Sequence, residues 1–234
     1  MHMKETIKKI GISSHPGVRL IAKVLRSGIK TPLFQLLKFR KENEMISLIR
    51  DIERERGFMM WPDEMAMLYT AARGMRHKQG DFAELGVSSA GSAKLLCELK
   101  GEKAIHLFDT FEGLPDPDGN DKHLKKGQYK CSLPAVKKYL EKYPSVFYYP
   151  GYFPSTAGPA EEKVFSLVHL DVDLYQSTLD GIKFFFPRLV KGGMLISHDY
   201  STVPGVKKAF DEYFADAPEM VIELPTSQCL VVKN

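Results

Sequence analysis

The chain has 234 residues, of which 44% are hydrophobic and 26% are charged, values that are ordinary for a globular protein. No apolar run approaches the roughly 20 residues of a membrane span and no signal-peptide pattern opens the chain, so we expect a cytoplasmic protein. The length suits one large α/β domain, or else two small ones. Three widely spaced cysteines form no zinc-type pair and are expected to be reduced and buried: Cys97, Cys131 and Cys229.

The net charge of +4 is unevenly distributed along the chain. Residues 1–41 contain ten Lys or Arg and one acidic residue, a charge of +9, so the remaining residues carry −5. We expect residues 1–75 to form a basic N-terminal helical arm or lid, and residues 76–234 to form the main domain. Within the arm, apolar side chains recur at helical spacing: Val18, Leu20, Ile21, Val24 and Leu25.

The role of this arm is open at the level of sequence. A basic amphipathic helix can lie on an anionic membrane surface or bind an acidic partner. It can equally pack on the main domain or on the second subunit of a homodimer, with its basic side in water. Binding of nucleic acid is not expected, because the chain has no recognised nucleic-acid module and its aromatic residues are not interleaved with the basic ones.

The pattern after the arm predicts two helices and then an alternation of strands and helices. Helices are expected at 43–56 and 62–76, the second with Pro62 in its first turn and Asp63 and Glu64 at its positive end. Strands are expected at 81–86, 104–109, 146–150, 165–171, 193–197, 219–223 and 228–233. Helices are expected between them at 90–100, 133–142, 175–188 and 204–215.

Such alternation is typical of a doubly wound α/β fold. We expect a seven-stranded, mostly parallel sheet with helices on both faces. Only a short turn at residues 225–227 separates the last two strands, so the last strand should run antiparallel to the others. Ligands of such sheets bind at the carboxyl ends of the strands.

The first strand ends in Glu84 and Gly86 and opens into a turn of small residues, 87–92. The spacing is not the Gly-x-Gly-x-x-Gly of a dinucleotide site, and a carboxylate at the turn suits a cationic ligand such as a sulfonium or an amino group. The second strand ends at Asp109, where an acid can accept hydrogen bonds from both hydroxyls of a ribose. The alternative for both acids is helix capping and loop solvation.

Acidic residues also end the fourth and fifth strands. Asp171 and Asp199 should face one another at the top edge of the sheet, where a hard divalent cation could take oxygen ligands from both. Asp173 is more simply explained as a cap of the next helix, and His169 as an interior histidine. His198 is open to interpretation as a metal ligand, an acid or base, or a rim residue.

Several sequence blocks occur in a recognisable order, at residues 81–87, 108–115, 151–156, 169–178, 187, 192–193 and 199–200. Together they resemble the macrocin O-methyltransferase family. These are Rossmann-like class I enzymes that use S-adenosylmethionine (SAM) to methylate sugar hydroxyls of macrolide, aminocoumarin and related glycosides. The resemblance implies that residues 76–234 are a SAM-binding methyltransferase domain in which the cofactor is held by Glu84, Gly86 and Asp109. We add further expected cofactor contacts from the turn and from the third block: Ser92, Gly151 and Tyr152.

The resemblance also implies that Asp171 and Asp199 hold Mg²⁺ and that Asp171 is a candidate general base. One departure matters, because His198 stands where the family usually has an aspartate. Imidazole suits Mn²⁺, Fe²⁺ or Zn²⁺ better than Mg²⁺. We therefore expect a divalent metal, Mg²⁺ or Mn²⁺, held by Asp171, His198 and Asp199, with His198 as the alternative catalytic base.

These observations favour a SAM-dependent O-methyltransferase acting on a hydroxyl of a sugar or glycoside, with metal assistance. Two other interpretations stay open. One is a SAM-fold protein that has lost its chemistry and acts through its basic arm. The other is a nicotinamide-dependent oxidoreductase, which the glycine spacing and the lack of a suitable Tyr-x-x-x-Lys pair disfavour. No family match is recognisable in the arm or in residues 116–130, so the sequence does not identify the acceptor.

Overall fold

The structure, a computed structural model, describes residues 28, 31–39, 41–57, 60–117, 121 and 124–234. The amphipathic helix expected around residues 18–25 therefore lies outside the described residues. Residues 31–39 are helical, with Phe34 and Leu37 buried. No helix among the described residues combines the length and the apolar character needed to cross a membrane.

Two helices precede the sheet, at the positions that the sequence predicts. Helix α3 (Asn43–Arg56) buries four apolar side chains on one face, and helix α4 (Pro62–Met75) begins with its proline in the first turn. Both helices contribute to the same apolar cluster as the first strand and the helix that follows it. In the described part of the region assigned to the arm, α4 thus packs on the sheet and α3 packs on α4 and α5. The expected boundary between residues 75 and 76 stays a prediction.

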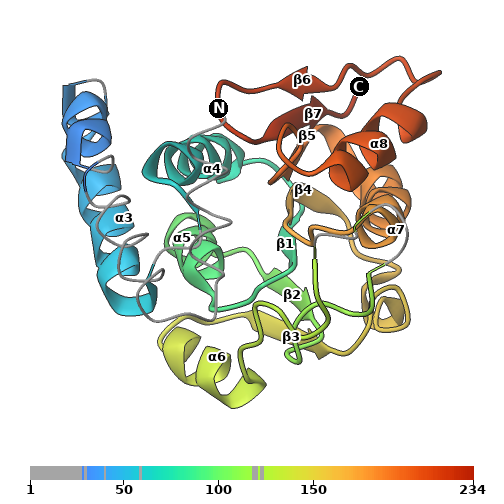
Figure 1. Cartoon of the computed structure of the whole chain (residues 1–234), viewed down its shortest axis with the longest axis horizontal. Helices are drawn as coiled ribbons and strands as arrows, with labels where there is room; N and C mark the ends of the chain where they lie inside the picture. The colour runs from blue at the N-terminus through green and yellow to red at the C-terminus, as the bar shows by residue number, and fades with distance from the viewer. Residues whose placement is uncertain (1–27, 29–30, 40, 58–59, 118–120, 122–123) are drawn as a thin grey trace.

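Within the described residues, seven strands form one sheet in the order β3-β2-β1-β4-β5-β7-β6 (Figure 1). Their bounds are β1 (Asp81–Leu85), β2 (Ile105–Asp109), β3 (Val146–Pro150), β4 (Phe165–Leu170), β5 (Leu189–Ser197), β6 (Ile222–Glu223) and β7 (Cys229–Val232). The strands from β1 to β5 pair in parallel, whereas β7 runs antiparallel to both β5 and β6. The predicted mostly parallel sheet with an antiparallel last strand is confirmed.

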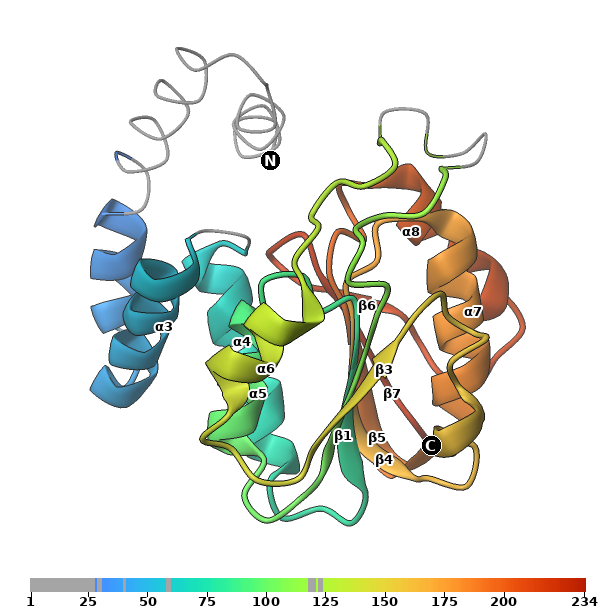
Figure 2. The ribbon, with the colours of Figure 1, turned by 90° about the horizontal axis from the view of Figure 1, so that it is seen from below.

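Helices cover both faces of this sheet, as predicted (Figure 2). The remaining α-helices are α5 (Gly91–Leu99), α6 (Leu133–Leu140), α7 (Tyr175–Phe185) and α8 (Pro204–Tyr213), with two short 3₁₀ turns at Gly158–Ala160 and Phe186–Arg188. Helices α4 to α6 lie on one face, with α3 packed outside α4 and α5, and all four share one apolar cluster; α7 and α8 pack on the other face through a second cluster. Successive side chains of the central strands therefore alternate between the two cores.

The order of the strands reverses between β1 and β4, which leaves a crevice at their carboxyl ends. Leu85 is in register with Leu170, and Leu170 with Ser197, so β1, β4 and β5 end at the same level. The residues that follow these three strands, Gly86, Asp171 and His198, are therefore neighbours. Gly86 has φ +91°, and a Cβ at this position would lie 1.9 Å from the carbonyl oxygen of Asp171.

Candidate active site

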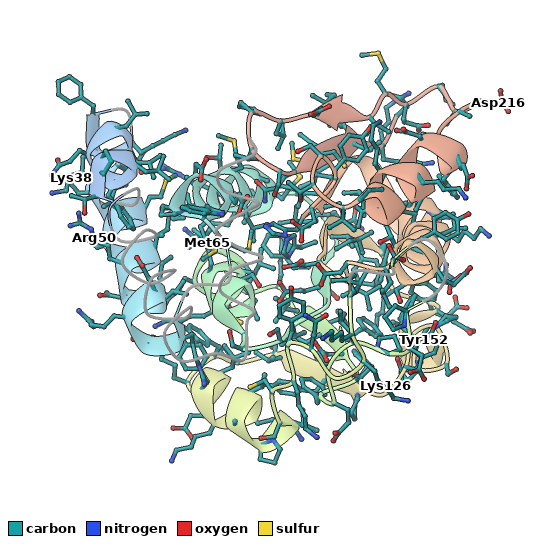
Figure 3. All side chains as sticks on the ribbon, viewed as in Figure 1. Lys38, Arg50, Met65, Lys126, Tyr152 and Asp216 are labelled. Carbon is teal, nitrogen blue, oxygen red and sulfur yellow. The ribbon has the colours of Figure 1, made fainter. Side chains whose placement is uncertain are left out.

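A cleft with about 1200 Å³ of space, including the part open to solvent, lies at the carboxyl ends of the strands. Its walls come from α3, α4, the ends of β1, β2, β4 and β5, and the segments that follow β2 and β3. Met65 on α4 and Tyr152 after β3 both line it and are well separated across the molecule (Figure 3). The cleft thus extends from the N-terminal helices to the β3 edge of the sheet.

Most of the residues expected at the site line this cleft: Gly86, Ser92, Asp109, Gly151, Tyr152, Asp171 and His198. Two expected residues do not line it. Glu84 is fully buried within the sheet, and Asp199 is buried beside His198. The sequence alone does not separate these two from the others, because burial depends on helices that are distant in the chain.

Asp109 is more heavily engaged in the protein than the sequence suggests. One carboxylate oxygen accepts the backbone N–H groups of Val87 and Ser88, at 2.7 and 2.8 Å, and the other accepts that of Phe111 at 2.7 Å. The side chain therefore joins the turn after β1 to the turn after β2, and both turns contribute to the cleft. Its expected contact with a ribose stays a prediction.

Glu84 forms a buried pair with His169 on the neighbouring strand, with 2.8 Å between Oε1 and Nδ1. Burial raises the pKa of the Glu84 carboxyl, against the opposing effects of His169 and of Ser92. The pair lies on the face of the sheet that carries α4 and α5, since the other side chains of this register, Phe82 and Leu167, belong to that core. His169 is thus an interior residue, in line with its expected role.

Three side chains that follow β4 and β5 converge into a compact group. The Nδ1 atom of His198 lies 3.0 Å from a carboxylate oxygen of Asp199 and 3.3 Å from one of Asp171. One ligand atom from each residue lies within 4.8 Å of the other two, which makes this a candidate metal centre among the described residues. Nδ1 is buried and has no hydrogen-bond partner, although it lies between two oxygens. A shared cation would satisfy all three atoms, so the donor set fits a divalent metal.

Glu64 is a member of this group that the sequence analysis did not identify. Its role there was only to favour the positive end of a helix, yet the side chain is 3% exposed and its Oε2 lies 3.1 Å from Nε2 of His198. The same carboxylate accepts the N–H of Trp61 at 2.7 Å and the hydroxyl of Ser227 at 2.8 Å. No local pattern could reveal this contact, because 134 residues separate the two partners.

Electrostatics in this group follow from burial and from the carboxylates. Burial disfavours a charged imidazole, but Asp199, Asp171 and Glu64 outweigh it and raise the pKa of His198 well above its ordinary value. Burial also opposes charge on Asp171 and Glu64, yet the neighbouring His198 holds the pKa of each carboxyl below its ordinary value. Without a metal, the group is therefore a charged imidazolium among carboxylates.

The acidic residue Asp121 supports the site from a distance. It is fully buried, and one of its oxygens accepts the N–H of Tyr175, the first residue of α7, at 2.8 Å. Its other oxygen packs so close to Gly205 in α8 that a Cβ there would lie 2.2 Å away. A residue from the segment after β2 thus joins the starts of two helices, and the sequence analysis did not identify it.

Comparisons with known proteins agree with this architecture. The solved structure of the O-methyltransferase NovP superimposes with a TM-score of 0.69 at 23% identity, covering 76% of this chain and 82% of that one. The calicheamicin methyltransferase CalS11 gives a TM-score of 0.61 at 18% identity, covering 82% and 94%. At these identities the likeness shows the fold alone, and it confirms the expected Rossmann-like fold.

Similarity in sequence is more specific than this similarity in fold. Demethyldecarbamoylnovobiocin O-methyltransferase of Streptomyces niveus is 29% identical over 153 residues, 58% of each chain. A tetracenomycin 4'-O-methyltransferase of Streptomyces olivaceus, named for its rhamnosyl-bearing substrate, is 30% identical over 152 residues, 57% of this chain and 58% of that one. The match spans less than two thirds of the length of these relatives. The sequence profile described as macrocin O-methyltransferase matches residues 56–223, well over half of the chain. The protein therefore belongs to the macrocin O-methyltransferase family.

Proposed function

We propose that this protein transfers the methyl group of SAM to a hydroxyl of a sugar or glycoside, with a divalent cation bound at the cleft. The observation that carries the proposal is the position of the Asp171, His198 and Asp199 group at the same strand ends that form the cleft. A cofactor pocket beside a cation site suits the methylation of a weakly acidic hydroxyl, because a cation can lower the pKa of that hydroxyl. The sugar-related names of the relatives support the choice of acceptor.

The cofactor side of the proposal rests on the small-residue turn and its neighbours. Gly86, Ser92, Asp109, Gly151 and Tyr152 line the cleft, and we assign them to SAM. The turn after β1 is made of small residues, and α5 starts at Gly91, where the first N–H groups of a helix have no acceptor within the helix itself. Glu84 is assigned a supporting role through the buried pair with His169 and through its position beside Ser92.

On the acceptor side, the protein must hold a hydroxyl in a fixed position and remove its proton, because a neutral hydroxyl is a poor nucleophile. A bound divalent cation would lower the pKa of a hydroxyl that it contacts. Asp171 is the residue placed to accept the proton, because its side chain is 24% exposed, whereas those of Asp199 and His198 are 3% and 4% exposed. Alignment of the hydroxyl with the methyl group can contribute about 7–11 kcal/mol in favourable cases.

The test combines binding with turnover. Calorimetry should show that SAM binds and that NAD does not, and a screen of glycosides with SAM should reveal an accepted hydroxyl. EDTA should abolish methyl transfer while SAM still binds, and Asp171→Asn should lower turnover by orders of magnitude with the same SAM affinity. Full activity in EDTA would contradict the metal and leave Asp171 or His198 as a base that acts without one. Binding of NAD in place of SAM would contradict the function itself.

The basic arm is assigned to contacts outside the cleft, with an anionic membrane surface or with a second copy of the chain. Deleting residues 1–41 should then change sedimentation with anionic vesicles at low salt, or the oligomeric mass, while SAM affinity stays the same. An unchanged mass together with unchanged vesicle binding would contradict both assignments.

A further inference from the structure

Glu64 joins three segments of the chain beneath the candidate metal centre. It stands in the first turn of α4, its carboxylate is almost completely buried, and its hydrogen bonds reach Trp61, Ser227 and His198. A buried carboxylate must be matched by donors, and here every partner is a donor or an imidazole nitrogen. Of these partners, His198 lines the cleft, so this contact is the one through which Glu64 can affect the candidate metal centre.

The imidazole of His198 has its two nitrogens in different surroundings. Nε2 faces the carboxylate of Glu64 at 3.1 Å, and Nδ1 faces Asp171 and Asp199 without making a hydrogen bond to either. A carboxylate can only accept, so the nitrogen beside Glu64 carries the hydrogen. The same argument gives Nδ1 a hydrogen while no metal is bound. A cation shared by Nδ1, Asp171 and Asp199 would take the place of that hydrogen and leave the one on Nε2.

We propose that Glu64 is a positioning residue that holds His198 as the Nε2–H tautomer, so that Nδ1 serves as a ligand atom for the divalent cation shared with Asp171 and Asp199. The inference rests on the metal assignment of the proposed function and adds a residue to it. In metal sites generally, a ligating histidine donates its other N–H to a carboxylate, a carbonyl or water, and loss of that partner typically lowers metal affinity by about 10–100-fold.

The arrangement also supplies what a histidine needs in order to bind a metal. Either oxygen of a carboxylate can serve as a ligand, whereas an imidazole nitrogen binds a metal only in the correct tautomer and ring orientation. His198 therefore needs a partner on the far side of its ring. Glu64 meets this need from α4, and Ser227 in the segment between β6 and β7 fixes the other oxygen of its carboxylate.

The experiment measures metal binding directly, in the full-length protein loaded with S-adenosylhomocysteine. Mn²⁺ affinity is obtained from the electron paramagnetic resonance signal of the free ion, and coordination by imidazole from the nitrogen coupling of the bound ion. Glu64→Leu keeps about the size of the side chain but removes the oxygen that faces both Trp61 and Nε2 of His198. Glutamine would not do this, because its amide oxygen can take that same position and accept from both. Ser227→Ala is the matched control, since it removes the other bond of the same carboxylate.

Wild-type protein should bind Mn²⁺ with a nitrogen coupling, and Glu64→Leu should bind it about 10–100-fold more weakly with the coupling reduced. Ser227→Ala should keep Mn²⁺ affinity within about twofold, a difference of roughly 0.4 kcal/mol. Thermal unfolding without metal establishes that both variants are folded. Because a variant can misfold, the wild type supplies a second measurement: the histidine ¹⁵N spectrum of the Zn²⁺-loaded protein should show hydrogen on Nε2 of His198 and zinc on Nδ1.

Three results would overturn the inference. They are unchanged Mn²⁺ affinity in Glu64→Leu, Mn²⁺ bound to the wild type without nitrogen coupling, and no Mn²⁺ binding by the wild type. SAM binding and methyl transfer are measured separately. If the protein methylates without a metal, the role of Glu64 is refuted and the transfer reaction is not. If it binds Mn²⁺ through nitrogen but never binds SAM, the transfer reaction is refuted and the role of Glu64 is not.

Discussion

Replacing Asp109 by alanine tests the part of the site where the structure adds most to the sequence. The carboxylate accepts three backbone N–H groups, from Val87, Ser88 and Phe111. In Asp109→Ala these donors lose their partner, and the turns after β1 and β2 lose their shared anchor. The substitution should therefore destabilise the protein without any ligand, in addition to any loss of ribose contacts.

The size of this effect follows from the three bonds. Asp109 is only partly buried, so each bond is worth about 1 kcal/mol, as for a helix cap, and the loss is about 3 kcal/mol in the free energy of unfolding. For a chain of this size, about 2–4 °C of melting temperature corresponds to 1 kcal/mol, so the midpoint should fall by about 6–12 °C. The affinity for SAM should fall at least tens-fold, because two cleft-lining turns are displaced and a charged hydrogen-bond partner is lost.

The assay is thermal and urea unfolding without cofactor, followed by calorimetry with SAM below the midpoint. Asp116→Ala is a suitable control, because that carboxylate is exposed and pairs with Lys126 at the surface, so its loss should change stability by no more than about 0.5 kcal/mol. An Asp109→Ala protein that melts with the wild type would refute the anchoring role. Weaker SAM binding in such a protein would place the carboxylate on the cofactor instead, whereas full SAM affinity would remove it from the site.

Two further outcomes follow from packing. Gly86→Ala should lower the free energy of unfolding by several times the roughly 1 kcal/mol expected for Gly127→Ala. Both glycines have positive φ, but only at Gly86 would a Cβ meet backbone, that of Asp171. Equal unfolding midpoints of the two variants would refute the close approach of β1 and β4. A thiol reagent at pH 8 should modify Cys131 quickly in the native protein, because this cysteine is partly exposed whereas Cys97 and Cys229 are buried, and burial raises the pKa of the Cys97 thiol to about 12. In urea all three cysteines should react. Rapid labelling of all three in the native protein would contradict this order of exposure.

The sequence by itself determined the secondary structure and the sheet. Apolar runs that end in an acid or a glycine predicted the strand ends at Leu85, Asp109 and Leu170 to within one residue, since burial on both faces leaves a continuous hydrophobic signal. The short connection before β7 was enough to predict its antiparallel direction. The order of the strands was not predicted, and it is the structure that shows how this order brings Gly86, Asp171 and His198 to one edge.

Only the tertiary structure decided which partner each polar side chain meets. Glu64 and Asp109 carried the signals of a helix start and of a ribose ligand, yet one contacts His198 across 134 residues and the other anchors two turns. Glu84, expected at the cofactor, is enclosed with His169, because α4 and α5 cover that face of the sheet. Periodicity reports which face of an element is buried, but a hydrogen bond between distant segments depends on how the packed layers place individual atoms, and no local pattern encodes this.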